Sequence, residues 1–230
     1  MEIDLLGHQA TRAYQLLASV VVPRPIAFVT SHNAQGRLNA APFSFFNLMG
    51  SRPPILAINV ADLEDGTPKH TRANIMTTKE FVVNLVHRDI AEKMNICAVD
   101  FPAEINELEA AGLSTDESTK ITVPRIAEAR VQIECTLAEI VNVGDNHIII
   151  GKILFLHIAD EYMDKEAMRV LTPNLDLIGR MHGGGWYTST ADIFEIPRMS
   201  YAEWQVRNEA DVEIQVVAEA GDSLEPGRMI

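Results

Sequence analysis

Cysteine is scarce in this sequence, and its scarcity argues against a disulfide framework. Only Cys97 and Cys135 occur among 230 residues, far fewer than a disulfide-stapled secreted domain carries. The N-terminal residues MEIDLLGHQATRAYQLL lack the basic start and apolar core of a signal peptide, and no apolar run is long enough to span a bilayer. We therefore expect a protein of the reducing cytoplasm that does not enter a membrane.

Basic residues are few as well. Lys and Arg total 19 against 32 Asp and Glu, which gives a formal net charge of −13. An acidic balance argues against general binding to nucleic acid or to anionic membranes, although a local basic pocket remains possible.

Several motifs that carry chemistry are missing. The chain has no HExxH and no HxH, and its histidines at 70, 147, 157 and 182 lie far apart in sequence. A metal-dependent hydrolase is an alternative only if these histidines converge in space with Asp or Glu. We therefore expect no metal site. There is no Gly-x-Gly-x-x-Gly after a strand and no Gly-Lys-Ser/Thr, so neither a Rossmann site nor a Walker loop is indicated.

What the chain does have is a series of β-type runs. Residues 26–30, 55–60, 80–86 and 128–158 are apolar and β-branched, and turn residues at 31–36 and 144–146 predict two hairpins. The alternation of apolar and polar residues in the last of these runs slips near Glu139, which predicts a bulge. Residues 147–158 are apolar enough for a strand buried on both faces. Residues 16–22 predict a short strand or an entry segment, and 80–86 predict a strand with Phe81, Val83 and Leu85 on one face. Residues 161–178 predict a connecting helix and loop.

Residues 39–47, NAAPFSFFN, mix three Phe with small and amide side chains. Small residues let a ligand approach the backbone, while the Phe rings form an apolar wall. The alternative is a strand–turn–strand whose Phe residues fill a core and whose Ser and Asn lie in a bend.

A locally basic helix start follows at Thr67. Thr67 and Pro68 are a good N-cap and first-turn pair, and Lys69, His70 and Arg72 follow with no acid before Lys79. Helix N-termini accept phosphate readily, so these residues predict an anion site. The alternative is a well-capped, solvated helix.

The order of these segments resembles the flavin reductase-like proteins, which bind FMN in a split β-barrel. PRPIAFVTS, LNAAPFSFFN, PPILAINV, TPKHTRANI, KEFVVNLV, EAAGLST, PRIAEARVQIEC and GRMHGGGWY occur in the family's order and cover most of residues 10–195. The resemblance implies a mainly β, antiparallel Greek-key split barrel with a few peripheral helices. It implies one domain over 1–230, with a helical excursion at about 89–112 and a C-terminal extension at about 192–230. In that extension the alternating Val212, Ile214 and Val216 predict an extra strand or a dimer arm.

The resemblance also implies a cofactor site. Thr30 and Ser31 would end the first strand at the ring or the ribityl chain, and Trp186 or Tyr187 would lie near the ring. The pocket would be lined by Asn39, Ala41, Ser44, Phe45, Phe46 and Asn47, and the phosphate bound by Thr67, Lys69, His70 and Thr71. Some members have a Gly-Asp-His turn whose His reaches the flavin, but here Asn146 holds that place and His147 follows, which reverses the side-chain direction in a strand.

The implied activity is that of an FMN oxidoreductase. NADH or NADPH would be the donor, bound shallowly over FMN, and the electrons would go to flavin, another acceptor or a partner monooxygenase. The family also implies a homodimer. A non-enzymatic, flavoredoxin-like FMN electron carrier is the main alternative.

Overall fold

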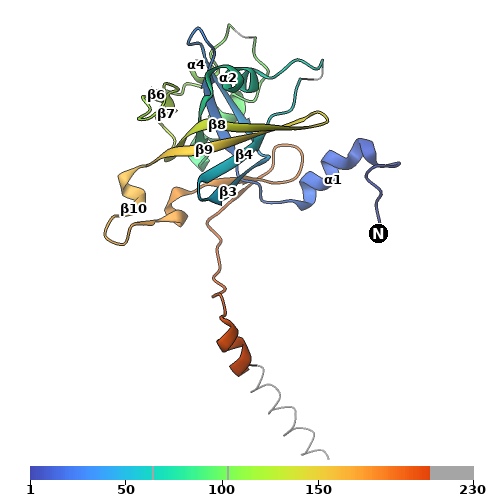
Figure 1. Ribbon diagram of the computed structural model, residues 1–230, viewed down its shortest axis with the longest axis vertical. Helices are drawn as coiled ribbons and strands as arrows, with labels where there is room; N and C mark the ends of the chain where they lie inside the picture. The colour runs from blue at the N-terminus through green and yellow to red at the C-terminus, as the bar shows by residue number, and fades with distance from the viewer. Residues whose placement is uncertain (64, 103, 208–230) are drawn as a thin grey trace, which may run out of the picture. The chain divides into compact units, whose positions relative to one another are not determined.

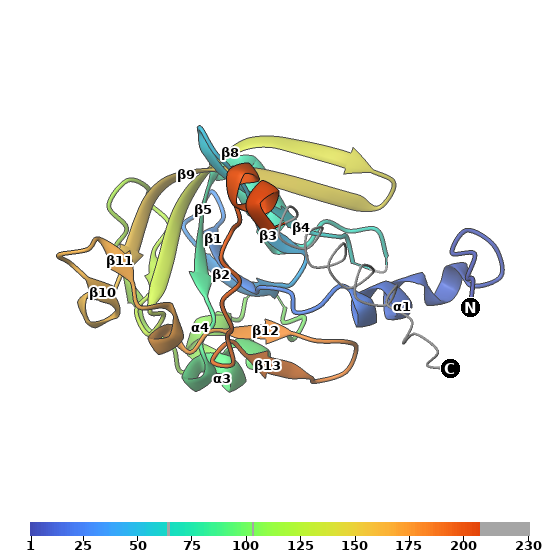
Figure 2. The ribbon, with the colours of Figure 1, turned by 90° about the horizontal axis from the view of Figure 1, so that it is seen from below.

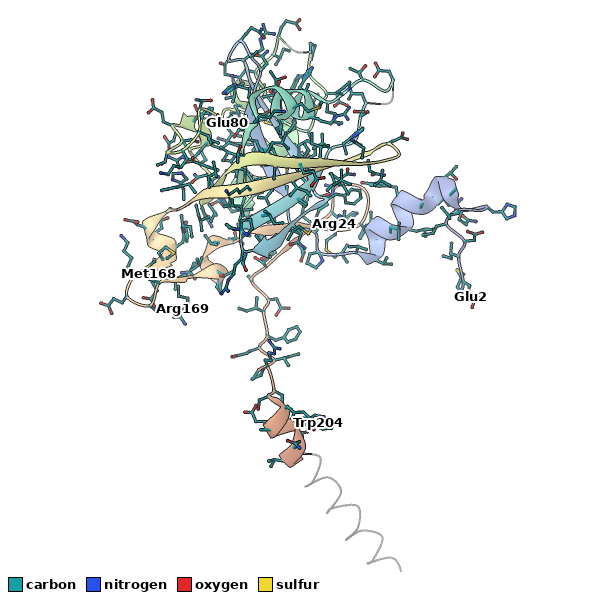
Figure 3. The ribbon with its side chains drawn as sticks, viewed as in Figure 1. Glu2, Arg24, Glu80, Met168, Arg169 and Trp204 are labelled. Atoms are coloured by element: carbon teal, nitrogen blue, oxygen red, sulfur yellow. The ribbon has the colours of Figure 1, made fainter. Side chains whose placement is uncertain are left out.

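The computed structural model describes residues 1–63, 65–102 and 104–207. Met1–Asp192 form one compact unit, and Ile193–Ile230 belong to a second. In the second unit residues 201–207 are helical, and Trp204 lies on this helix (Figure 3). The strand or arm predicted around Ile214 lies outside the described residues. Within the described ranges no helix is long and apolar enough to cross a membrane.

The first unit is built on a seven-stranded antiparallel sheet with the order β2-β1-β5-β8-β9-β4-β3 (Figure 1). Its strands are β1 (Ala27–His32), β2 (Leu38–Phe43), β3 (Phe46–Ser51), β4 (Pro54–Asn59), β5 (Glu80–Leu85), β8 (Val131–Val143) and β9 (Asn146–Ile158). β5, β8 and β9 pair in succession, and the earlier β4 lies beside β9, which is a Greek-key arrangement. The mainly β, antiparallel prediction is therefore confirmed.

Both predicted hairpins form. In the β1–β2 turn the Asn33 carboxamide oxygen accepts the N–H groups of Gln35 and Arg37 at 3.0 and 2.9 Å, and Gly36 supplies a φ of 79°. Gly144, at a φ of 55°, closes the β8–β9 turn. The register of that pair shifts between Leu137 and Glu139, which confirms the predicted bulge.

Strand β1, which lies between β2 and β5, contributes to two hydrophobic clusters. Phe28 packs in a cluster with Met94 and Leu108, and its neighbour Val29 packs in a second one with Phe81 and other strand residues. Alternate residues of a strand point to opposite faces, so β1 is covered on both sides. Phe81, Val83 and Leu85 all contribute to the second cluster, as predicted.

Peripheral helices cover one side of this sheet. The predicted excursion forms η2 (Arg88–Ile90), α3 (Ala91–Ile96) and α4 (Glu107–Ala110), and Gly112 ends it at a φ of 63°. Figure 2 shows α3 and α4 on the same side of the sheet as β12 (Ile178–Arg180) and β13 (Tyr187–Ser189). The small strands β6 (Thr115–Asp116) and β7 (Arg125–Ile126) pair with each other.

The predicted strand over 16–22 was wrong. The chain there forms η1 (Ala10–Arg12) and α1 (Ala13–Val20). The buried Arg24 stabilises the end of this helix, because its Nη1 donates to the carbonyls of Ala18 and Val21 at 2.6 and 2.9 Å. Its Nη2 donates to the Met181 carbonyl at 2.7 Å, so one guanidinium joins α1 to the segment after β12 (Figure 3 labels Arg24).

Two further expectations are corrected. β9 is not buried on both faces, since Leu156 is 53% exposed and Leu154 is also exposed. The segment 161–178 holds no α-helix; it forms η3 (Asp160–Tyr162), β10 (Met163–Asp164), β11 (Arg169–Val170) and η4 (Thr172–Leu175). The Asp164 carboxylate accepts the Ala167 N–H at 3.1 Å, and Met168 adopts a φ of 48°, which favours the tight hairpin whose tip is labelled in Figure 3.

Candidate functional site

A pocket of about 600 Å³, including space open to solvent, lies where β2 meets the start of α2 (His70–Thr78). The segment after α3 forms another wall, with Val99, Asp100 and Phe101, and Glu107 of α4 closes one side.

Five of the predicted cofactor residues line this pocket: Asn39, Ala41, Lys69, His70 and Thr71. They come from two segments that are separated in sequence by β3 and β4, and the fold brings them together. An adjoining hollow contains a sixth, Ser44, and shares Pro42, Phe43 and Ala98 with the first.

The start of α2 differs from the prediction. The helix begins at His70 with Lys69 as its N-cap residue, and no side chain caps it. Thr67 lies outside the helix, where its N–H donates to the Asp65 carboxylate at 2.8 Å. The N-cap of the helix therefore lies two residues later than the predicted N-cap at Thr67, which the Asp65 side chain holds in the preceding loop. The first N–H groups of a helix have no intrahelical partner, and His70 and Thr71 line the pocket at this end.

Asn39 links the two sides of the pocket. In the amide orientation that satisfies both of its polar atoms, its Oδ1 accepts from the Thr71 hydroxyl at 3.0 Å and its Nδ2 donates to Glu107 Oε1 at 3.1 Å. Asn39 and Thr71 are both buried. Their positions are thus fixed before any ligand binds.

The fold places two acidic side chains, Asp100 and Glu107, beside the basic segment at the start of α2. Lys69 Nζ lies 3.5 Å from the carboxylate of Asp100, whose side chain is 75% exposed. Glu107 is 7% exposed and accepts the Ala40 N–H at 3.3 Å. Burial raises the pKa of Glu107, while the N–H of Ala40 and the nearby His70 act against that rise. Neither acid is predicted from the sequence, because both come from the region of the helical excursion and belong to no local motif of the pocket.

Thr30 and Ser31 do not line the pocket. Both are buried: the Thr30 hydroxyl donates to the Pro124 carbonyl at 2.8 Å, and Ser31 Oγ accepts from Asn74 Nδ2 at 3.2 Å. Their side chains stabilise the packing of β1 against its neighbours.

The remaining predicted residues also lie apart from the pocket lining. Phe45 is 45% exposed and meets the ring of Tyr14 edge-on at 6.1 Å, whereas Phe46 packs against the core. The Asn47 side chain accepts the N–H of Leu48 at 2.8 Å. Trp186 is 63% exposed beside the ring of His182. The Phe that lines both hollows is Phe43 instead.

His147 is bonded elsewhere. Its Nδ1 lies 2.6 Å from Asn142 Oδ1 and its Nε2 lies 3.0 Å from Asp62 Oδ2. Asp62 also pairs with Arg72 of α2. These contacts tie the β8–β9 hairpin to α2. Across the residues that the structure describes, no group of three or more His, Cys, Asp or Glu is placed to hold a metal ion.

Comparison with known proteins agrees with the resemblance. Residues 19–178 match the flavin reductase like domain family. The chain is similar to the 2-nitrobenzoate 2-nitroreductase NbaA of Pseudomonas fluorescens, at 37% identity and a TM-score of 0.78, over 87% of this chain and 98% of that one.

Two further solved structures are similar. Nitrilotriacetate monooxygenase component B of Bacillus cereus has 31% identity and a TM-score of 0.79, over 85% of this chain and 98% of that one. A split barrel domain protein of Shewanella frigidimarina shares the fold at 19% identity, with a TM-score of 0.75 over 86% of this chain and all of that one. The predicted split β-barrel is confirmed, and the chain belongs to the flavin reductase like domain family.

Proposed function

We propose that this protein is an FMN-binding oxidoreductase of the cytoplasm that takes reducing equivalents from NADH or NADPH. The observation that carries the proposal is the pocket between β2 and α2. It gathers Asn39 and Ala41 with Lys69, His70 and Thr71, which are five of the residues that the family resemblance predicts around FMN.

The pocket suits a phosphorylated, partly aromatic ligand. Lys69 would hold the phosphate as a point charge, together with the N–H groups at the start of α2. Ala41 leaves room for a ligand beside the β2 backbone. Pro42 and Phe43 provide apolar surface that continues into the adjoining hollow with Ser44. Bound FMN would supply the redox chemistry, accepting hydride and passing electrons on.

The residues Asn39 and Thr71 would bind and orient the cofactor. The Thr71 hydroxyl and the Asn39 amide are already hydrogen-bonded to each other, so they offer fixed polar groups at little entropic cost. The apolar side of the pocket would limit the access of water to the ring.

The electron acceptor is flavin, another small molecule or a partner protein. One similar structure is a monooxygenase component B and another is a nitroreductase, and these similarities support an acceptor outside the cofactor pocket. A flavoredoxin-like electron carrier is the second candidate, favoured by the lack of a Gly-x-Gly-x-x-Gly nucleotide motif. It would bind FMN equally well, yet oxidise NADH and NADPH negligibly.

We also propose that the protein is a homodimer. β3 is an edge strand of the sheet and exposes Leu48 and Met49, and α1 exposes Tyr14, Leu17 and Val20. Exposed apolar side chains on an unpaired edge favour association with another chain. A second copy of this chain is the partner that the family resemblance implies.

The phosphate assignment is tested by a double substitution. Lys69→Ala with Thr71→Ala removes a charge and a hydroxyl from the pocket, so FMN affinity should fall by more than about tenfold. Flavin fluorescence during titration measures the dissociation constant. The control is Lys165→Ala, because Lys165 pairs with Asp160 outside the pocket. Equal affinity in the double variant and the control would refute the assignment.

A further inference from the structure

Glu107 is a buried carboxylate on the wall of the pocket, and the proposed function gives it no role. It is the first residue of α4 and lines the pocket with Lys69 and His70. It also lines a shallower hollow on its other side, next to Asn39 and His70. Glu is rarely buried unless it is paired, and here its carboxylate lies beside the group predicted to bind an anion.

The carboxylate is held in place. Oε2 accepts the Ala40 N–H at 3.3 Å, and Oε1 accepts Asn39 Nδ2 at 3.1 Å. The backbone of Glu107 is fixed too, since the Cys97 thiol lies 3.3 Å from its carbonyl. Asp100 is exposed and can rotate away from an incoming anion, whereas Glu107 has no such freedom.

The positive charges near Glu107 do not neutralise the negative charge that a phosphate would bring. Lys69 and His70 face it from α2, Cys97 and Asp100 from α3 and the following segment, and Arg37 from the hollow beside β2. Burial, followed by the charge of Glu107, raises the pKa of Cys97 to about 12, so Cys97 remains a neutral thiol. Lys69 is already paired with Asp100. A phosphate would therefore add a charge of about −2 to a pocket lined by one lysine, one histidine and two acids.

We propose that the phosphate of the ligand is accommodated by proton uptake at Glu107. The carboxylate would take one proton from solvent as the anion binds, and the resulting acid would offer an O–H donor in place of a repelling charge. This inference rests on the proposed function, because it takes FMN as the ligand.

Two physical effects favour the uptake. Burial already raises the pKa of Glu107 in the free protein, and an additional negative charge nearby raises it further. By linkage, the affinity for FMN should fall with rising pH, by up to about tenfold per pH unit while one proton is taken up.

Calorimetry of the whole protein tests the proposed proton uptake at Glu107. FMN and riboflavin, which lacks the phosphate, are each titrated in pairs of buffers with different ionisation enthalpies, from about pH 6 to about pH 9. We expect the wild type to take up close to one proton per FMN within this range, and close to none with riboflavin. Glu107→Gln should lose that uptake and bind FMN more tightly than the wild type at the upper end of the range.

His70→Gln is the matched control, because the His70 imidazole lines the same pocket as Glu107 and its side chain is exposed, so the variant should fold. Proton uptake that persists in His70→Gln supports protonation of Glu107. This holds even if circular dichroism shows that Glu107→Gln does not fold. Uptake that is absent from the wild type, unchanged in Glu107→Gln or lost in His70→Gln overturns the inference. Failure of the proposed function would look different, because neither flavin would then produce binding heat.

Discussion

At the scale of single residues, the pocket depends on a competition between charges. Lys69 is the cation best placed for a phosphate, yet it already contacts Asp100 at 3.5 Å. Both side chains are substantially exposed, so the ion pair is weak and screened by solvent. A phosphate would have to replace Asp100 as the partner of Lys69.

Asp100→Asn should therefore strengthen FMN binding, by up to about fivefold, because the Lys69 ammonium loses its competitor. Titration at low ionic strength measures the effect, which added salt should reduce. Asp160→Asn is the control, since Asp160 forms a similar exposed pair with Lys165 outside the pocket. Weaker binding in Asp100→Asn would mean that Asp100 supports the site rather than opposes it.

Sequence reasoning predicted the pocket residues that lie in contiguous motifs. Asn39 and Ala41 come from one motif and Lys69, His70 and Thr71 from the next, so each group was visible as a local pattern. Asp100 and Glu107 were not, because their approach depends on how the helical excursion packs against β2. Thr30 and Ser31 were placed at the ligand although their hydroxyls bond to other parts of the protein.

At the scale of elements, the long strand β8 anchors the loop over 118–124. Glu134 on this strand is fully buried and accepts the N–H groups of Thr119 and Lys120 at 2.6 and 2.7 Å. His157 of β9 contacts it at 2.5 Å. Burial alone would raise the pKa of Glu134, but the two N–H donors and His157 outweigh it and lower the pKa.

A carboxyl whose pKa is lower in the folded state stabilises the protein above its unfolded pKa, and this stabilisation is lost as pH falls through the folded pKa. Glu134→Gln should lower the free energy of unfolding at neutral pH by about 2–4 kcal/mol, because buried donors lose a charged acceptor. It should also lose less stability than the wild type between about pH 5 and about pH 3, where the unfolded and then the folded carboxyl of Glu134 takes up a proton. Urea unfolding at neutral pH and at these two pH values measures this.

The exposed Glu139 on the same strand gives the control variant Glu139→Gln, which should match the wild type. A wild-type pH slope retained in Glu134→Gln would show that another group is responsible for the acid sensitivity.

The strands of the sheet were predictable because their β-branched residues and turns act locally. The error at α1 has a physical cause: short apolar runs do not distinguish helix from strand. The end of this helix is also held by the Arg24 side chain, which in turn bonds to the distant Met181 carbonyl. The outer face of β9 was also mispredicted, since its apolar residues include the exposed Leu154 and Leu156.

At the scale of the whole molecule, the exposed apolar residues of β3 and α1 are the basis for the proposed homodimer. Leu48→Asp adds a charge to this surface, so it should shift the protein toward monomer. Light scattering after size exclusion measures the mass. Arg169→Asp at the exposed tip of the β10–β11 hairpin is the control. A monomeric wild type at micromolar concentration would contradict the proposal.

The central claim is tested most directly by the absorbance of the purified protein after incubation with FMN and desalting, followed by anaerobic addition of NADH or NADPH. We expect a retained flavin spectrum that bleaches on addition of one of these donors. A protein that emerges colourless after desalting and does not quench flavin fluorescence in solution would contradict the claim, whereas retained flavin that neither donor bleaches would favour the electron carrier.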